Sequence, residues 1–269
     1  MQITNRDIIQ AIEQAAPRRL QESYDNTGLQ CGNPQAACTG VILCVDVTPA
    51  IIAEAIERGC NLVISHHPLL FRAIKSIDAR GRVQQSLVAA IKNDITVYSC
   101  HTAVDNAPGG ISHVMARMLG LTDVTTLEER PADATLGTVG CGVTGTLPSP
   151  LTPLEFVELV KTTFGSPVAR CSDPEALTPG RLISRIALCG GAGAFLLDRA
   201  TAIGADAFVT SDTKFNCFLD YADSLLLVDI GHFESENCSK EIFYHAITKK
   251  FPNFAVYYSQ VEQNPIKYL

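Results

Sequence analysis

Two adjacent histidines, His66 and His67, are separated by a single residue, Ser65, from the short apolar run 62–64. Such a run is typical of a strand buried on both faces of a sheet, and Pro68 marks its end because proline cannot donate to a strand ladder. The two imidazoles therefore lie at the carboxyl end of a strand, where open α/β sheets place their ligands. Neighbouring side chains on an extended chain point to opposite sides, so the two histidines would not converge on one ion, but each could serve one member of a metal pair. For an isolated His-His, two loop histidines without a ligand are the more common case.

Two further strand ends carry the same residue types. His101 follows the strand-like segment 97–100, and Asp105 comes four residues after it. His232 follows an apolar strand, and Glu236 again comes four residues later. If a helix begins near residue 233, its first turn brings Glu236 close enough to His232 to share an ion. Imidazoles and carboxylates suit Zn, Mn or Fe(II). A single strand-end histidine is more often a hydrogen-bonded polar residue than a ligand, but three such ends together favour a metal site.

The elements that position these residues show a recurring design. Thr4 and Asp7 predict a helix start of the capping-box type, and Thr152 and Glu155 predict another in the second half of the chain. The turn 189–194 is rich in glycine and joins a strand to a helix. It lacks the third glycine of a dinucleotide fingerprint and the Lys-Ser/Thr of a P-loop, so we interpret it as a tight turn rather than an anion cradle.

Three segments of the first half have counterparts in the second half. Besides the two helix starts, the strand–helix–strand pattern of 40–64 returns at 183–209, and the segment 94–99 matches 253–259. Chance similarity between β–α units is the alternative. We therefore predict an α/β protein made of two similar repeats, with mixed β-sheets flanked by helices. The repeats are expected at 1–124 and 125–269, and the two could be intertwined.

Composition and charge limit the classes of partner. The chain has 269 residues, of which 46% are hydrophobic and 18% charged, and its net charge is −7. A phosphate backbone needs a basic face, so we expect no direct nucleic-acid binding. No apolar run is long enough to span a membrane, and the first six residues do not resemble a signal peptide, so we expect a cytoplasmic protein. The ten cysteines contain no C-x-x-C pair and are expected to be structural thiols in a reducing compartment.

At this point the motifs as a set become recognisable. The segment 23–32 (SYDNTGLQCG), the segment 65–68 (SHHP), the pattern His101-Thr102-x-x-Asp105 and the pattern Gly231-His232-x-x-x-Glu236 resemble those of the NIF-three-like family. Members of this family often carry the name GTP cyclohydrolase I type 2 homologue. Two positions depart from the family pattern: Tyr24 stands where tryptophan is usual, and Ala103-Val104 replaces Asn-Leu. Neither departure falls on a ligand.

The resemblance implies two α/β halves with a dinuclear metal site between them, and assembly into homohexamers. The ligands of the two divalent ions (Zn, Fe or Mn) would be His66, His67 and Asp105 from the first repeat, and His232 and Glu236 from the second. His101 would be a close neighbour that orients a ligand or shuttles a proton.

Two functions are compatible with such a site. One is a metal-dependent hydrolase, GTP cyclohydrolase-like or acting on another cyclic amide or phosphoester, whose metal-bridging water attacks an unknown small-molecule substrate. The other is a non-catalytic metal-binding scaffold, metal-delivery or regulatory protein. Open coordination positions favour the hydrolase, and the absence of a strong substrate motif favours the scaffold.

Overall fold

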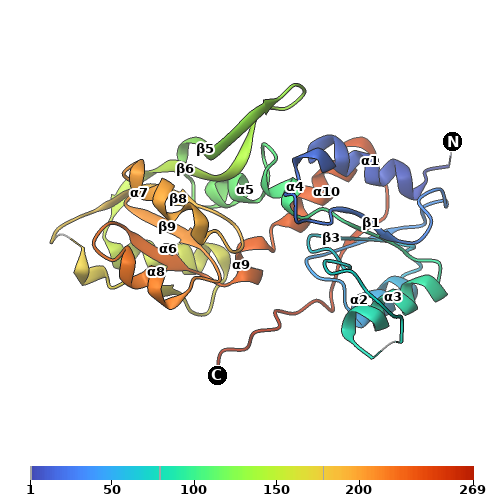
Figure 1. Cartoon of the computed structure of the whole chain (residues 1–269). Helices are drawn as coiled ribbons and strands as arrows, with labels where there is room; N and C mark the ends of the chain where they lie inside the picture. The colour runs from blue at the N-terminus through green and yellow to red at the C-terminus, as the bar shows by residue number, and fades with distance from the viewer. Residues whose placement is uncertain (1, 79, 178) are drawn as a thin grey trace. The chain divides into compact units, whose positions relative to one another are not determined.

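Two mixed β-sheets organise the chain in the computed structural model (Figure 1). The structure describes residues 2–78, 80–177 and 179–269. One sheet belongs to a unit formed by Met1–Ala107 and Ser239–Pro265, and the other to a unit formed by Pro108–Cys238 and Ile266–Leu269. We call these unit 1 and unit 2. The mixed α/β class predicted from the sequence is confirmed.

The sheet of unit 1 is built around three parallel strands in chain order. They are β2 (Val41–Cys44), β3 (Leu62–Ser65) and β4 (Thr96–Ser99), and every residue in them is buried. The edge strands are β1 (Gly28–Cys31), antiparallel to β4, and β11 (Val256–Tyr258), parallel to β2. Near-continuous apolar runs form such strands because helices cover both faces of the sheet.

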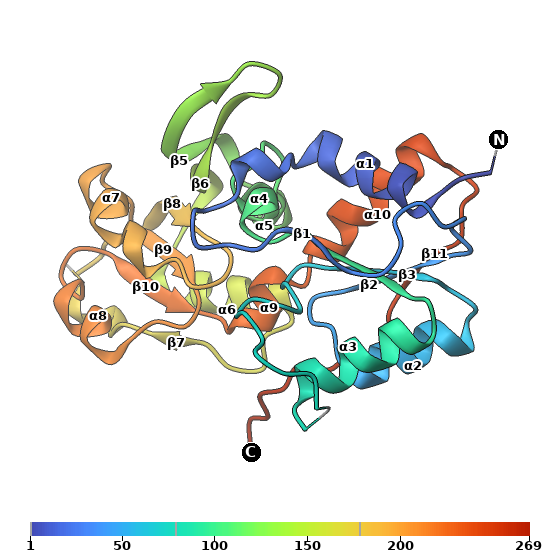
Figure 2. The same cartoon turned by 45° about the vertical axis from the view of Figure 1, so that its right-hand side comes forward.

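Helices cover this sheet on both sides (Figure 2). One face packs against α2 (Pro49–Glu57) and α3 (Arg82–Lys92), and the other against α1 (Asn5–Ala15) and α10 (Ser239–Lys250). The short helices η1 (Arg18–Leu20) and α4 (Thr102–Asp105) complete unit 1. The core under α2 and α3 joins strand residues such as Val63 to helix residues such as Ile52.

The two helix starts predicted from the sequence are confirmed. At α1, the Thr4 backbone N–H donates to Asp7 Oδ2 at 2.8 Å, and the Asp7 N–H donates to Thr4 Oγ1 at 3.3 Å. At α6 (Pro153–Phe164), the Thr152 N–H donates to Glu155 Oε2 at 2.9 Å, and the Glu155 N–H donates back at 3.4 Å. Each pair satisfies two backbone donors that a helix start leaves without an intrahelical acceptor.

The sheet of unit 2 has six strands and a similar parallel centre. The central strands are β8 (Ile183–Leu188), β9 (Ala207–Thr210) and β10 (Leu226–Asp229), and β7 (Arg170–Cys171) runs antiparallel to β10. On the other side, β6 (Gly137–Leu151) runs antiparallel to β8 and forms a long hairpin with β5 (Thr122–Asp133). The tip of this hairpin extends away from the rest of unit 2, as the green ribbon in Figure 1 shows.

Most helices of unit 2 are short, with α6 as the longest at 12 residues. They are α5 (Ile111–Met118), η2 (Pro174–Ala176), η3 (Ala194–Leu196), α7 (Leu197–Ala202), α8 (Phe215–Asp220) and α9 (His232–Glu236). The core on one face of the sheet packs Phe208 and Leu227 against α7, with Cys217 and Phe218 of α8 partly buried beside them. None of the described helices has the length and apolar character needed to cross a membrane.

The strand order of the two sheets matches over the parallel centre. In each unit three parallel strands lie in chain order, and an antiparallel strand follows the third. The strands that end at Ser65 and Thr210 are both the middle ones, as expected for corresponding segments. The match of 94–99 with 253–259 is wrong, because β11 lies beside β2 in the first sheet and the counterpart of β4 is β10. The duplication itself, with its boundary after residue 124, stays a prediction.

All ten cysteines lie in the described part of the chain, and none of them forms a disulfide. Burial raises the pKa of the Cys31 thiol to about 11 and that of Cys38 to about 12, from a usual value of 9.0. The thiolate is the reactive form, so at pH 8 we expect Cys31 to react with iodoacetamide about 100-fold more slowly than an ordinary thiol. Mass spectrometry of the labelled native protein measures this rate, and labelling as fast as in urea would contradict it.

Candidate metal centre

His66 and His67 directly follow β3, and their backbone N–H groups still hydrogen-bond to the end of the neighbouring strand β2 and the residue after it. The His66 N–H donates to Cys44 O at 3.1 Å, and the His67 N–H donates to Val45 O at 2.9 Å. The His66 ring is fully buried and the two ring centroids lie 4.8 Å apart, at an interplanar angle of 44°. The expectation that the two side chains point to opposite sides is therefore wrong. The reason is local: β3 ends at Ser65 and the chain bends at both histidines, so strand alternation no longer applies.

The end of β4 brings His101 to the same pair of histidines. Its ring centroid lies 5.2 Å from that of His66 and 5.5 Å from that of His67. One ring nitrogen of each of the three histidines lies within 4.8 Å of the other two. Asp105, at the end of the single turn of α4, has its Oδ1 4.0 Å from His66 Nε2. The sequence predicted His101 as a neighbour of the ligands, and the structure places it among the possible ligands themselves.

Each of these imidazoles is held through Nδ1 by an oxygen that can only accept. His101 Nδ1 is 2.8 Å from Asp25 Oδ1, His67 Nδ1 is 3.2 Å from Asp46 Oδ2, and His66 Nδ1 is 3.1 Å from Cys100 O. Since a carboxylate and a carbonyl have no proton to give, Nδ1 is the protonated nitrogen in each ring. The lone pair is then on Nε2, which is the arrangement found in metal-binding histidines.

The two carboxylates that hold these rings are ionised. Burial by itself would raise the pKa of Asp25, but hydrogen bonds from His101 and Thr102 outweigh burial and lower it below its usual range. The same balance lowers the pKa of Asp46, where the hydrogen bond from His67 outweighs burial. Sequence reasoning missed both residues. Asp25 lies within the motif 23–32, but nothing in that motif indicates that its carboxylate contacts a histidine 76 positions later.

In unit 2, His232 and Glu236 lie on the same side of the short helix α9. His232 Nε2 is 2.9 Å from Glu236 Oε2, and His232 Nδ1 is 2.9 Å from Asp212 Oδ2. The 2.9 Å separation of His232 Nε2 and Glu236 Oε2 is that of a hydrogen bond, and it is shorter than the distance of about 3.3 Å between two ligands of one tetrahedral Zn. Glu236 is 3% exposed. The prediction that Glu236 lies close to His232 is confirmed. The contact of Asp212 with His232 was not predicted from the sequence.

The glycine-rich turn 189–194 supports this pair instead of facing an anion. The Gly191 N–H donates to Ser235 Oγ at 3.0 Å, and the Gly193 N–H donates to Thr210 Oγ1 at 2.9 Å. These donors are therefore used within unit 2, as a tight structural turn requires. A Cβ built on Gly191 would lie 2.1 Å from Glu236 Oε1, so this turn forms one wall around the carboxylate.

The contact between Gly191 and Glu236 gives a test with a close control. Gly191 has φ +67°, and Gly204 has φ +70° with open space around its ideal Cβ. We expect Gly204→Ala to lower the free energy of unfolding by about 1 kcal/mol, through the left-handed backbone alone. Gly191→Ala should cost at least about 1 kcal/mol more, because its methyl displaces the Glu236 carboxylate. Urea unfolding measures both values, and equal losses would show that Gly191 is not a packing constraint.

The residues present fit a divalent metal ion. Unit 1 offers three imidazoles with a carboxylate nearby, and unit 2 offers an imidazole and a buried carboxylate 2.9 Å apart. This donor set is the one that Zn, Mn and Fe(II) prefer.

Comparisons with known proteins identify the family of this chain. A family profile described as Duf34/NIF3 (NGG1p interacting factor 3) matches residues 3–265. The Clostridium perfringens protein named GTP cyclohydrolase 1 type 2 homolog is 35% identical over 231 residues, which are 86% of each chain. A Lactococcus lactis protein of the same name is 31% identical over 266 residues, which cover 96% of this chain and 97% of the relative.

Solved structures share the whole fold. A Bacillus cereus protein related to NIF3 superposes with a TM-score of 0.91 at 23% identity, covering 100% of this chain and 99% of that one. A Staphylococcus aureus hypothetical protein also has a TM-score of 0.91, at 26% identity, with both chains covered completely. The histidine and carboxylate motifs, the fold and the sequence match over nearly the whole length agree, and this chain belongs to the Duf34/NIF3 family.

Proposed function

We propose that this protein is a metal-dependent hydrolase that uses two divalent ions per chain. The residues that would hold the ions are His66, His67, Asp105, His232 and Glu236. The observation that carries the proposal is the fixed orientation of the imidazoles. Each has Nδ1 on an oxygen of the protein, which puts the lone pair on Nε2. In His66 and His67 this lone pair would bind a cation, and in His101 it would accept a proton. When bound, divalent ions polarise a carbonyl or phosphoryl oxygen and acidify a water molecule.

His101 and Asp25 would move the proton in such a hydrolysis. With Nδ1 held by the Asp25 carboxylate at 2.8 Å, His101 can accept a proton from the attacking water at Nε2 and return it to the leaving group. The ionised Asp25 stabilises the imidazolium that forms in between. His101 is partly exposed, so a substrate can approach this side of the ring.

Metal content is the first test of this proposal. Five ligands exceed the number that one tetrahedral ion needs, so we expect about two ions per chain by elemental analysis. The protein is purified without chelator and then reloaded with Zn, Mn or Fe(II). One ion or none after reloading would overturn the two-ion site.

Hydrolysis is the second test. The names of the relatives make GTP the first substrate to assay, followed by cyclic amides and phosphodiesters. We expect turnover that is lost with chelator and lost in His67→Ala, while His245→Ala, at an exposed position of α10, serves as the unchanged control. Two bound ions without turnover of any of these substrates would favour the non-catalytic scaffold or metal-delivery role.

Assembly is a separate part of the proposal. The resemblance to the family leads us to propose a homohexamer. Light scattering should then give six times the chain mass of 28.9 kDa. A mass equal to that of one chain would overturn it.

A further inference from the structure

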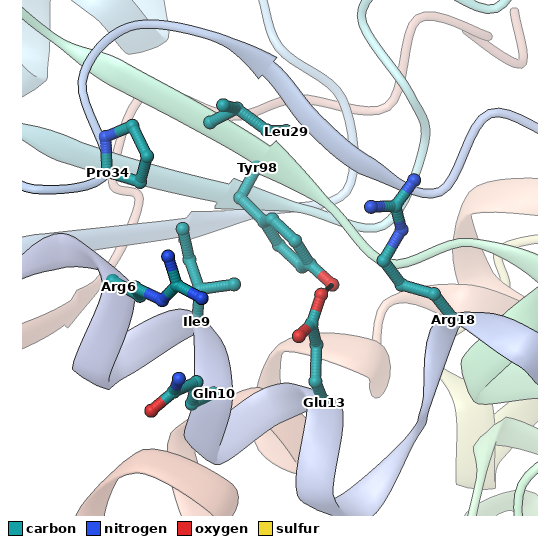
Figure 3. Close-up of a pocket in the computed structure, with 8 residues that line it drawn as sticks. All are labelled: Arg6, Ile9, Gln10, Glu13, Arg18, Leu29, Pro34 and Tyr98. Atoms are coloured by element: carbon teal, nitrogen blue, oxygen red, sulfur yellow. Dashed lines mark hydrogen bonds between the residues drawn. The ribbon is translucent and has the colours of Figure 1, made fainter.

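Unit 1 contains a cavity of about 240 Å³ on the helix α1 side of its sheet (Figure 3). Its apolar surface comes from Ile9, Leu29 and the ring of Tyr98, and its charged groups are Arg6, Glu13 and Arg18. None of these residues belongs to the candidate metal centre. The cavity is therefore separate from that centre.

The position of Arg18 is fixed by the backbone beside it. Its Nε donates to Thr27 O at 3.1 Å. Gly28 has φ +134°, and a Cβ at this position would lie 2.7 Å from Arg18 Cζ. The Arg18 guanidinium therefore packs against Gly28, which has no side chain. This packing and the bond to Thr27 O set its orientation, without a carboxylate partner among the described residues.

The position of Glu13 is fixed by a neutral group. The Tyr98 hydroxyl donates to Glu13 Oε1 at 3.1 Å, and Tyr98 is 1% exposed. Burial raises the pKa of Tyr98, so its hydroxyl stays protonated and keeps this role as a donor. Figure 3 shows the Glu13 carboxylate between Arg6 and Arg18 at the rim of the Tyr98 ring.

Opposite charges thus share one cavity without neutralising each other. Within the described part of the chain, neither arginine forms an ion pair with Glu13 at 4.0 Å or less. A ligand with only negative charge would meet the Glu13 carboxylate, and a ligand with only positive charge would meet two guanidinium groups. A small molecule that carries both charges satisfies each side.

We propose that this cavity binds a small zwitterion of the α-amino acid class with an apolar side chain. The ligand carboxylate accepts hydrogen bonds from Arg18, an arginine–carboxylate contact that is often bidentate. The ligand ammonium group pairs with Glu13. The apolar side chain of the ligand packs on Ile9 and Leu29, of which Leu29 is 44% exposed.

The test compares three probes with the full-length protein by isothermal titration calorimetry. L-Leucine has both charges, 4-methylpentanoate lacks the ammonium group, and 3-methylbutylamine lacks the carboxylate. We expect leucine to bind and each single-charge analogue to bind at least tenfold more weakly. No heat of binding with leucine, alanine or valine would overturn the proposal, and so would equal affinity for leucine and 4-methylpentanoate.

Variants then assign the binding to this cavity. Arg18→Met and Glu13→Gln should each weaken leucine binding at least tenfold, and the control variants Arg185→Met and Glu57→Gln, both at exposed positions, should not. Circular dichroism checks the fold of each. Unchanged leucine affinity in folded Arg18→Met would overturn the assignment. A change in oligomer mass in Arg18→Met, with no leucine binding to the wild type, would instead assign the cavity to a contact between chains.

Discussion

Glu236→Gln is expected to lower the affinity for both proposed ions by on the order of 100-fold or more. Removing a residue that only orients a ligand typically costs 10–100-fold, and Glu236 would be a ligand itself. Glu236 is 3% exposed and its carboxylate lies 2.9 Å from His232 Nε2. In the Gln variant, solvent therefore cannot reach this position to stabilise the ions in place of the lost negative charge. The amide is nearly isosteric, so packing against Gly191 should remain.

The measurement is metal affinity by competition with a chromophoric chelator. His67→Ala removes one terminal ligand and should empty one site preferentially, whereas Glu236→Gln should weaken both together. Glu158→Gln is the control, because Glu158 pairs with Lys161 on the surface of α6. Two tightly bound ions in Glu236→Gln would exclude Glu236 as a residue shared by both.

Asp25→Asn is expected to have the largest effect outside the proposed ligands. The Asp25 carboxylate is fully buried and accepts hydrogen bonds from His101 Nδ1, the Thr102 N–H and the Thr27 hydroxyl. An amide accepts at only one atom and donates at the other, which leaves buried donors unsatisfied and costs about 2–4 kcal/mol of stability. It can also donate to His101 Nδ1, which moves the ring proton to Nε2.

Two measurements separate the structural effect from the effect on His101. Denaturant unfolding gives the stability loss, and NMR of the imidazole nitrogens reports which of them carries the proton. Asp46→Asn removes the corresponding carboxylate beside His67 and serves as the comparison. The Asp46 side chain is 38% exposed and its contact with His67 is 3.2 Å long, so both effects should be smaller. An unchanged His101 tautomer in Asp25→Asn would show that Asp25 does not fix this ring.

The strand ends could be predicted from the sequence because they depend on local patterns. A buried strand needs a continuous apolar run, and the residue after it must leave the sheet edge, so the places of His66, His101 and His232 follow from a few neighbouring residues. The His232–Glu236 pair could be predicted as well, because a helical turn brings residues four apart onto one face.

The orienting carboxylates could not be predicted, because they depend on how distant strands are ordered. Asp25 contacts His101 because β1 pairs antiparallel with β4, and the local sequence of neither strand predicts that pairing. Likewise Asp212 meets His232 because β9 lies beside β10. The direction of His67 was predicted wrongly for a related reason. Alternation holds only while the chain stays extended, and β3 ends at Ser65.

The return of Ser239–Pro265 to unit 1 has a consequence for the order of folding during synthesis. This segment supplies α10 and β11, and it closes contacts such as Ser259 Oγ to Glu54 Oε2 at 2.6 Å and Val45 N–H to Glu262 Oε1 at 2.6 Å, more than 200 residues apart. Such distant pairings form slowly. A ribosome that has reached residue 238 has released most of unit 2, while β2 still lacks β11, one of its two neighbouring strands. Unit 1 therefore cannot complete its fold until the end of the chain is made. We expect chaperones to stay bound to the nascent N-terminal segment longer than to the segment 108–238.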